Sequence, residues 1–172
     1  MNLYRSPYEA YPFLCDDGDN FCCDFELLTD ELASHIGLLR AKLQDKTLQE
    51  ELLWICEIVY HMNPALRTHL TVTKAETQKL ANIVEHLQAG CAGRCKRFVL
   101  PVGCEAACEA HLLRVKCKSL VRLLYRHNQQ GHEVPELLFD LCNLLSGYFF
   151  HLALKLNDME CVDEVPYVSR NY

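Results

Sequence analysis

The chain of 172 residues is half hydrophobic and carries 17 basic against 23 acidic side chains, which gives a net charge of −6 at pH 7. This length suits a single domain with a substantial core, and the acidic balance without any basic run argues against bulk binding of nucleic acid. The N-terminus has no basic stretch followed by an apolar one, and no apolar run reaches the roughly 18 residues that span a bilayer, so we expect a cytoplasmic protein that does not enter a membrane.

Helical periodicity dominates the first half of the chain. Residues 1–23 are predicted to be irregular, because prolines and the polar run DDGDN mark turns. Apolar residues then recur every three or four positions over 25–43, which predicts an amphipathic helix. A second helix is expected to open at a capping box formed by Thr47 and Glu50 and to stop before Pro64.

The second half continues this pattern. A capping box that starts at Thr73 opens a third helix, for which Gly90 is the expected left-handed cap. A fourth helix is predicted over 105–128, and a fifth begins at Pro135, where the missing amide costs nothing. The fifth helix is apolar on more than one side, so we expect neighbours to cover it from several directions. With a tail over 159–172, the sequence predicts a single all-α domain of five helices.

The eleven cysteines are odd in number and several fall inside predicted helices, which disfavours a disulfide scaffold. Two sets of them leave a metal site open as an alternative. Structural zinc usually takes four well-spaced ligands, often from shorter C-x-x-C knuckles, so we assign no metal ligand to either set. The sets are Cys15, Cys22 and Cys23 near the start, and Cys91, Cys95, Cys104 and Cys108 before and within the fourth predicted helix.

The fourth predicted helix carries a stripe of cations separate from its apolar face. Arg114, Lys118 and Arg122 recur every four residues and therefore lie along one side of the helix. On base rates such a stripe is a solvated face, and the spacing alone does not favour a binding site over that interpretation. The alternative is a site for an anion on an otherwise acidic protein.

Three motifs surround this stripe: FVLP from Phe98, R-x-x-C-K from Arg114 and N-x-x-S from Asn143. They resemble F-[IV]-L-P-G-G, A-R-x-x-C-R-R-A-E-R and L-N-R-L-S-D of the corrinoid adenosyltransferases of the propanediol-utilisation (PduO) type. TDELASHIG near the start is similar to the family's V-D-E-L-N-x-x-I-G, and L-L-R-x-K is similar to the ethanolamine-utilisation (EutT) branch. The resemblance implies an all-α five-helix bundle that assembles as a homotrimer, with active sites between subunits.

The resemblance also implies roles for the matching residues. Asp30 and Arg114 match an aspartate and an arginine that pair across the subunit interface, and Phe98 matches an aromatic ring beneath the corrin. Asn143 and Ser146 match further positions of the site. Without the resemblance, Phe98 is interpreted as a core aromatic that anchors the segment before the fourth helix, since a buried Phe contributes roughly 1.5 to 3 kcal/mol.

The nucleotide site departs from the family pattern. Lys118 keeps one point charge for a phosphate, and Arg122 is a candidate substitute one turn further on. The Thr/Gly-rich phosphate loop is reduced to the stretch from Asp17 to Asp19, which would repel phosphate unless a metal ion lay between them. We therefore expect ATP with Mg to bind weakly. Four residues stand where the family has charged side chains: Ser119, Val121, Leu144 and Gly147.

The resemblance implies an ATP:cob(I)alamin adenosyltransferase with cobalamin and ATP as its cofactors. Reduced cobalt is itself the nucleophile that attacks the 5′-carbon of ATP and releases triphosphate, so the protein supplies position and electrostatics. Two alternatives stay open, because a fold does not fix a function. One is a non-catalytic relative that binds a corrinoid or another tetrapyrrole beside an eroded ATP site. The other is a thiol- or metal-binding protein on the same bundle.

Overall fold

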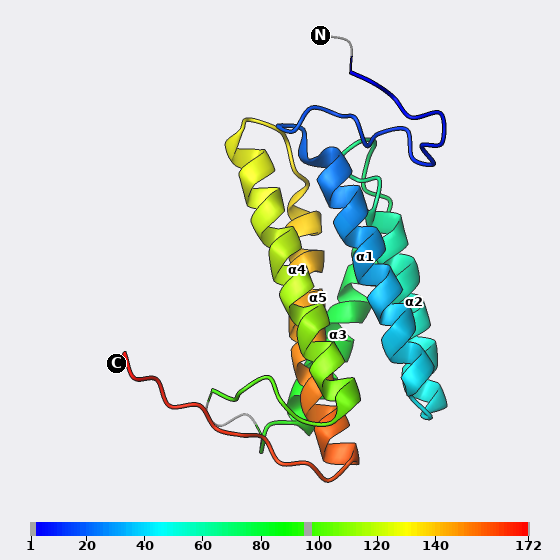
Figure 1. Ribbon diagram of the computed structural model, residues 1–172. Helices are drawn as coiled ribbons and strands as arrows, with labels where there is room; N and C mark the ends of the chain where they lie inside the picture. Colours follow the sequence, from blue (N-terminus) through cyan, green and yellow to red (C-terminus); the bar gives the residue numbers. More distant parts are fainter. Residues whose placement is uncertain (1–2, 95–97, 172) are drawn as a thin grey trace.

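The computed structural model describes residues 3–94 and 98–171, and within them the chain forms five helices, as predicted (Figure 1). α1 packs against α2 and α4, and α5 packs against α3 and α4. In Figure 1, α1 and α4 run side by side at the front, with α5 behind α4. The helices are α1 (Phe21–Lys42), α2 (Lys46–Met62), α3 (Lys74–Gly90), α4 (Glu105–Gln129) and α5 (Glu136–Met159).

The first helix begins earlier than predicted. Asn20 is its N-terminal cap, and the Asn20 side-chain oxygen accepts a hydrogen bond from the Cys22 amide at 3.1 Å. Cys22 and Cys23 therefore lie in the first turn of α1, where both are buried. The prediction that residues 1–23 are irregular is wrong for the last three, because the polar run that marks the turn also supplies the cap.

The start of α2 also differs from the prediction. The Asp45 carboxylate accepts from the Leu48 amide at 3.0 Å, so the helix is capped two residues before the expected capping box at Thr47. A carboxylate at this position stabilises the positive end of the helix dipole, which a threonine hydroxyl does less well. The prediction at Thr47 is therefore wrong.

The other helix ends are close to expectation, with one exception. The capping box at Thr73 is confirmed, and α4 stops before Gly131, whose φ of +92° requires a glycine. Pro135 caps α5 rather than forming its first residue. Gly90 lies inside the last turn of α3 without a positive φ, so its predicted left-handed conformation is wrong.

The apolar α5 is covered by α3 and α4, as its sequence predicted. By length and composition it could span a bilayer, with a mean hydropathy of 1.5 over its most apolar window. The core helix of a helical bundle passes the same test, and half of that window is buried inside the bundle. The side chains of Tyr148 and Phe149, both fully buried, contribute to the shared core.

A partly buried ion network, here called the N-terminal clamp, ties the segment before α1 to the bundle. Arg67 donates to Glu26 through Nε at 2.7 Å and Nη2 at 2.8 Å, and to Asp16 through Nη2 at 2.9 Å. Its guanidinium lies 3.6 Å from the centroid of the Phe13 ring. Tyr11 donates to Glu26 Oε2 at 2.6 Å, and Glu26 is only 5% exposed. These contacts fix residues 11–16 against the end of the bundle.

Candidate active site

The segment over 98–104, here called the lead-in, runs beside the C-terminal tail at the foot of the bundle (Figure 1). Backbone hydrogen bonds join the two: Leu100 N donates to Val165 O at 2.9 Å, and Tyr167 N donates to Phe98 O at 2.7 Å. The Phe98 side chain is 85% exposed. Its interpretation as a core aromatic is therefore wrong for the protomer.

Phe98 belongs to a larger group of exposed apolar side chains, here called the lead-in surface. The group spans both the lead-in and the tail, because the backbone pairing brings the two segments together. Exposed apolar side chains gathered on paired segments form a candidate binding surface. The members are Phe98, Leu100, Val102, Val165, Tyr167 and Val168.

The junction between the lead-in and α4 is fixed by Asn157 of α5. This fully buried side chain accepts from the Cys104 amide at 3.0 Å and donates to Val102 O at 3.3 Å. Gly103 has a φ of +149°, and a Cβ built there would lie 2.0 Å from Asn157 Oδ1. Only glycine fits this close approach, so Gly103 and Asn157 together set the direction of the segment that carries Phe98.

Gly103→Ala is expected to lower the free energy of unfolding by about 1 to 3 kcal/mol, because the backbone conformation is strained for alanine and Asn157 must move. Chemical denaturation measures this loss. Gly93→Ala is the matched control, since a Cβ there meets no atom within 4 Å, and it should change stability by less than about 0.5 kcal/mol. Equal losses in the two variants would contradict this account of the junction.

Arg114 lies where α4 meets α5. Its guanidinium carbon is 5.9 Å from the centroid of the Phe150 ring, and its backbone oxygen accepts from Ser146 Oγ at 3.5 Å. The Arg114 Nε is buried and has no hydrogen-bond partner among the described residues. A buried donor without an acceptor costs free energy, so this position is suited to an anion supplied from outside the protomer.

His111 lies one turn before Arg114 on the same helix. It is 4% exposed, its ring centroid is 6.3 Å from that of Phe150, and its Nδ1 is buried without a partner in the described part of the chain. Burial, with a further effect of the Arg114 cation, lowers the pKa of His111 to about 4 against the opposing effect of Glu164. His111 is therefore a neutral imidazole at pH 7.

The unfolded chain is expected to bind one more proton at residue 111 than the folded chain between about pH 6.5 and pH 4, so stability should fall as the pH drops through this range. His111→Phe should reduce that loss by up to about 3 kcal/mol. Denaturation at pH 7 and at about pH 4.5 measures it, with the exposed His86→Phe as control. Burial also lowers the pKa of His127 and His151, so stability of the His111→Phe variant should still fall to some extent as the pH drops. An unaltered pH dependence in His111→Phe would contradict this prediction.

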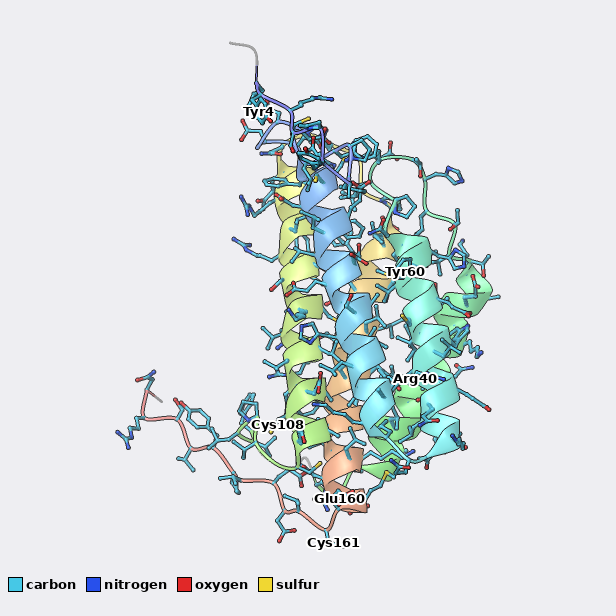
Figure 2. All side chains as sticks on the ribbon, turned by 45° about the vertical axis from the view of Figure 1, so that its right-hand side comes forward. Tyr4, Arg40, Tyr60, Cys108, Glu160 and Cys161 are labelled. Carbon is cyan, nitrogen blue, oxygen red and sulfur yellow. The ribbon has the colours of Figure 1, made fainter. Side chains whose placement is uncertain are left out.

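Asp30 is exposed on α1 and contacts α2, not α4. The Tyr60 hydroxyl donates to Asp30 Oδ1 at 2.8 Å, and Figure 2 shows Tyr60 on α2. Within the described residues, no ion pair joins Asp30 to Arg114. Their pairing between subunits stays a prediction.

Lys118 and Arg122 line a groove of about 640 Å³ between α1 and α4, here called the α1–α4 groove. Arg126, which none of the sequence motifs includes, lines it as well, and Asp24 is the one carboxylate among the lining residues. The remaining lining residues are Ser119 and four apolar residues, Leu27, Leu28, Val115 and Leu123.

The structure distributes the predicted site residues over several places. Asn143 is exposed on α5 and donates from Nδ2 to Phe139 O of its own helix at 2.9 Å. Arg114 and Ser146 come together between α4 and α5, and Lys118 and Arg122 come together in the α1–α4 groove. Phe98 lies in the lead-in beside the C-terminal tail, and Asp30 lies beside α2.

No group of three or more metal-ligating side chains occurs within residues 3–94 and 98–171. Cys22 Sγ donates to Leu66 O at 3.5 Å and Cys91 Sγ donates to His151 O at 3.6 Å, as packed thiols do. Burial raises the pKa of both thiols, which disfavours the thiolate that a metal needs. Cys108 lies at the foot of α4 (Figure 2), and Cys95 lies outside the described residues. The described cysteines thus give the thiol or metal alternative no preformed site.

The family model described as Cobalamin adenosyltransferase matches residues 28–156. Among curated protein sequences, none matches the chain significantly. Solved structures with the same fold include variants of a PduO-type ATP:corrinoid adenosyltransferase from Lactobacillus reuteri.

A phenylalanine-to-alanine variant of that protein, complexed with cobalamin and ATP, is 19% identical with a TM-score of 0.77 over 87% of each chain. A phenylalanine-to-histidine variant, also with cobalamin and ATP, is 19% identical with a TM-score of 0.78 over 95% of this chain and 97% of that one. An arginine-to-lysine variant complexed with ATP is 21% identical with a TM-score of 0.73 over 86% of each chain.

Proposed function

Because the chain belongs to the cobalamin adenosyltransferase family, whose pattern matches residues 28–156, we propose that it transfers the 5′-deoxyadenosyl group of ATP to the cobalt of a reduced corrinoid. The observation that carries this proposal beyond family membership is the placement of Phe98, which is 85% exposed on the lead-in surface. A large apolar ring held outside the core is available to cover one face of a flat macrocycle.

In the proposed reaction, cob(I) attacks the 5′-carbon of ATP. The Co–C bond forms, the C–O bond breaks, and triphosphate leaves with the electron pair of that bond. Phe98 lies against the lower face of the corrin and excludes water and side-chain donors from the lower axial position of cobalt. Without that axial donor, the cobalt orbital that accepts an electron falls in energy, so cob(II) is more easily reduced to the reactive cob(I).

We place the complete site between subunits of a homotrimer. The protomer leaves apolar side chains exposed on α1 and α4, and it leaves the Arg114 Nε buried without an acceptor among the described residues. Asp30 of a neighbouring subunit is the proposed acceptor, because the exposed carboxylate is held only by the Tyr60 hydroxyl in the protomer. Outside the α1–α4 groove, the exposed apolar residues of these two helices include Leu38 and Leu112.

Arg114→Ala is expected to weaken the trimer by several kcal/mol, roughly the 3 to 5 kcal/mol lost when one partner of a buried ion pair is removed. Sedimentation velocity over a range of protein concentrations should show dissociation at concentrations where the wild type stays assembled. Lys74→Ala, at an exposed cation at the start of α3, is the control and should leave the trimer intact. A wild type that is monomeric, or a variant that assembles normally, would contradict the proposed interface.

A second candidate function is a corrinoid- or tetrapyrrole-binding relative without adenosyl transfer, and the N-terminal clamp favours it. The resembling enzymes wrap the ATP phosphates with the segment that corresponds to these residues. Here that segment carries Asp16, Asp17 and Asp19, and the nearby Arg67 is already bound by Glu26 and Asp16. Nucleotide with Mg is therefore expected to bind weakly, through Lys118 and Arg122 on α4.

The location that we propose is the cytoplasm, where a reducing environment keeps cysteines as thiols. One experiment distinguishes the two candidate functions. Reduced corrinoid is titrated with the protein under anaerobic conditions, with and without ATP, and absorbance is recorded. ATP-dependent formation of the Co–C bond supports the adenosyltransferase. Binding that ATP does not alter supports the non-catalytic relative, and an unchanged spectrum contradicts both.

A further inference from the structure

The α1–α4 groove holds one more cation than the family resemblance provides. Arg126 lies in the last turn of α4, and its guanidinium carbon is 4.5 Å from the centroid of the Phe21 ring at the start of α1. Phe21 is 5% exposed, so its ring is held in place and makes a cation–π contact with the Arg126 guanidinium. This contact holds the Arg126 side chain against the start of α1, and Arg126 also lines the groove.

Lys118, Arg122 and Arg126 are spaced by four residues along α4. A rise of 1.5 Å per residue separates neighbouring Cα atoms along the axis by about 6 Å, so the series covers about 12 Å. Side chains of this length converge readily on one elongated anion. None of the three forms an ion pair with a carboxylate among the described residues, although the protein as a whole carries a net charge of −6.

The walls of the groove indicate the class of the anion. Cations occupy the α4 side, whereas Leu27 and Leu28 of α1 with Val115 and Leu123 of α4 supply apolar surface. A ligand that joins a polyphosphate to an aromatic base presents both kinds of surface. Arginine suits the phosphate part, because its planar fork donates two parallel hydrogen bonds to phosphate oxygens.

We propose that Arg126, with Lys118 and Arg122, binds the polyphosphate of the nucleotide in the α1–α4 groove, and that it supplies a cation where this chain lacks charged side chains of the family pattern. The proposal rests on the proposed function, because it names where the triphosphate of that reaction is held. Asp24, which lines the same groove, opposes the binding of a bare polyphosphate by charge repulsion.

The test is a calorimetric titration with inorganic triphosphate, without corrinoid or Mg, at low ionic strength, where exposed charges are least screened. Each charge-assisted contact is worth about tenfold or more in affinity, so Arg126→Met and Arg122→Met should each weaken binding by about that factor. Arg126→Lys should keep part of the affinity, and Asp24→Asn should strengthen binding. The thermal midpoint of each variant checks that the fold is retained.

Lys46→Met is the matched control, because it removes one exposed charge at the start of α2, away from the groove. It should leave triphosphate affinity unchanged. The proposal is overturned if Arg126→Met binds triphosphate like Lys46→Met, or if the wild type binds none.

The outcomes for the groove and for the reaction are separable. Adenosyl transfer by Arg126→Met with an unaltered KM for ATP overturns the groove as the phosphate site and leaves the adenosyltransferase in place. The opposite outcome is a wild type that forms no Co–C bond but binds triphosphate with an affinity that Arg126→Met weakens. That outcome supports the groove as a phosphate site and contradicts the adenosyltransferase reaction.

Discussion

Phe98→Ala is expected to abolish the four-coordinate cob(II) signal of protein-bound corrinoid and to slow adenosyl transfer by about 100-fold, a typical cost of imperfect positioning at a reacting centre. The alanine cannot cover the lower face of the corrin, so water or the corrinoid's own base returns to the axial position and cob(II) becomes harder to reduce. Electron paramagnetic resonance of cob(II) with protein and ATP measures the coordination state directly.

The structure makes this variant informative because Phe98 is 85% exposed in the protomer. Substitution of an exposed side chain usually changes the free energy of unfolding by no more than about 0.5 kcal/mol, so the fold should survive. Tyr8→Ala is the matched control: Tyr8 is 93% exposed and lies on the N-terminal segment, far along the chain from the lead-in. A five-coordinate wild type, or a signal that persists in Phe98→Ala, would contradict the role of this ring.

Glu26→Ala is expected to lower the free energy of unfolding by about 3 kcal/mol, at the low end of the cost of breaking a buried ion pair. Glu26 is 5% exposed and accepts hydrogen bonds from Arg67 and from Tyr11. Its removal leaves Arg67 with Asp16 as its remaining carboxylate partner and leaves the Tyr11 hydroxyl without its acceptor. The loss should stay below about 5 kcal/mol, because Asp16 and the Phe13 ring still hold the guanidinium.

Urea denaturation of Glu26→Ala, Arg67→Met and the double variant measures the coupling energy between the two side chains. Glu50→Ala removes an exposed glutamate in the first turns of α2 and serves as the control, with an expected change within about 0.5 kcal/mol. Protection of residues 11–16 from proteolysis should be lost together with the stability. A loss below about 1 kcal/mol in Glu26→Ala would show that the N-terminal clamp contributes little to the fold.

Helix bounds were predictable where one local signal stood alone. The capping box at Thr73 and the stop at Gly131 are such cases. Where several signals competed, the choice failed: Asp45 and Thr47 both offer a side-chain cap, and the polar run that ends at Asn20 was interpreted as a turn alone. Capping is worth about 1 kcal/mol, so the packing of the following helix decides between neighbouring candidates.

In the candidate site, too, some features were predictable from local sequence and others were not. Arg126 continues the four-residue series of Arg114, Lys118 and Arg122, so extending the stripe by one more turn would have found it. Pairing of the lead-in with the tail joins residues far apart in the chain, Phe98 with Tyr167, and nothing in either segment indicates the other. The exposure of Phe98 depends on this pairing, which is why the sequence left its core and site interpretations both open.

The most direct test of the proposed reaction is product stoichiometry in a single turnover. Protein in excess is mixed anaerobically with cob(I) corrinoid and ATP, and the adenosylated corrinoid and the released triphosphate are quantified by chromatography. We predict that both appear in equal amounts and at the same rate, because one displacement at the 5′-carbon makes one Co–C bond and frees one triphosphate. Corrinoid that stays bound without an adenosyl group while ATP is unchanged, or ATP that is cleaved to other products, would contradict the proposed reaction.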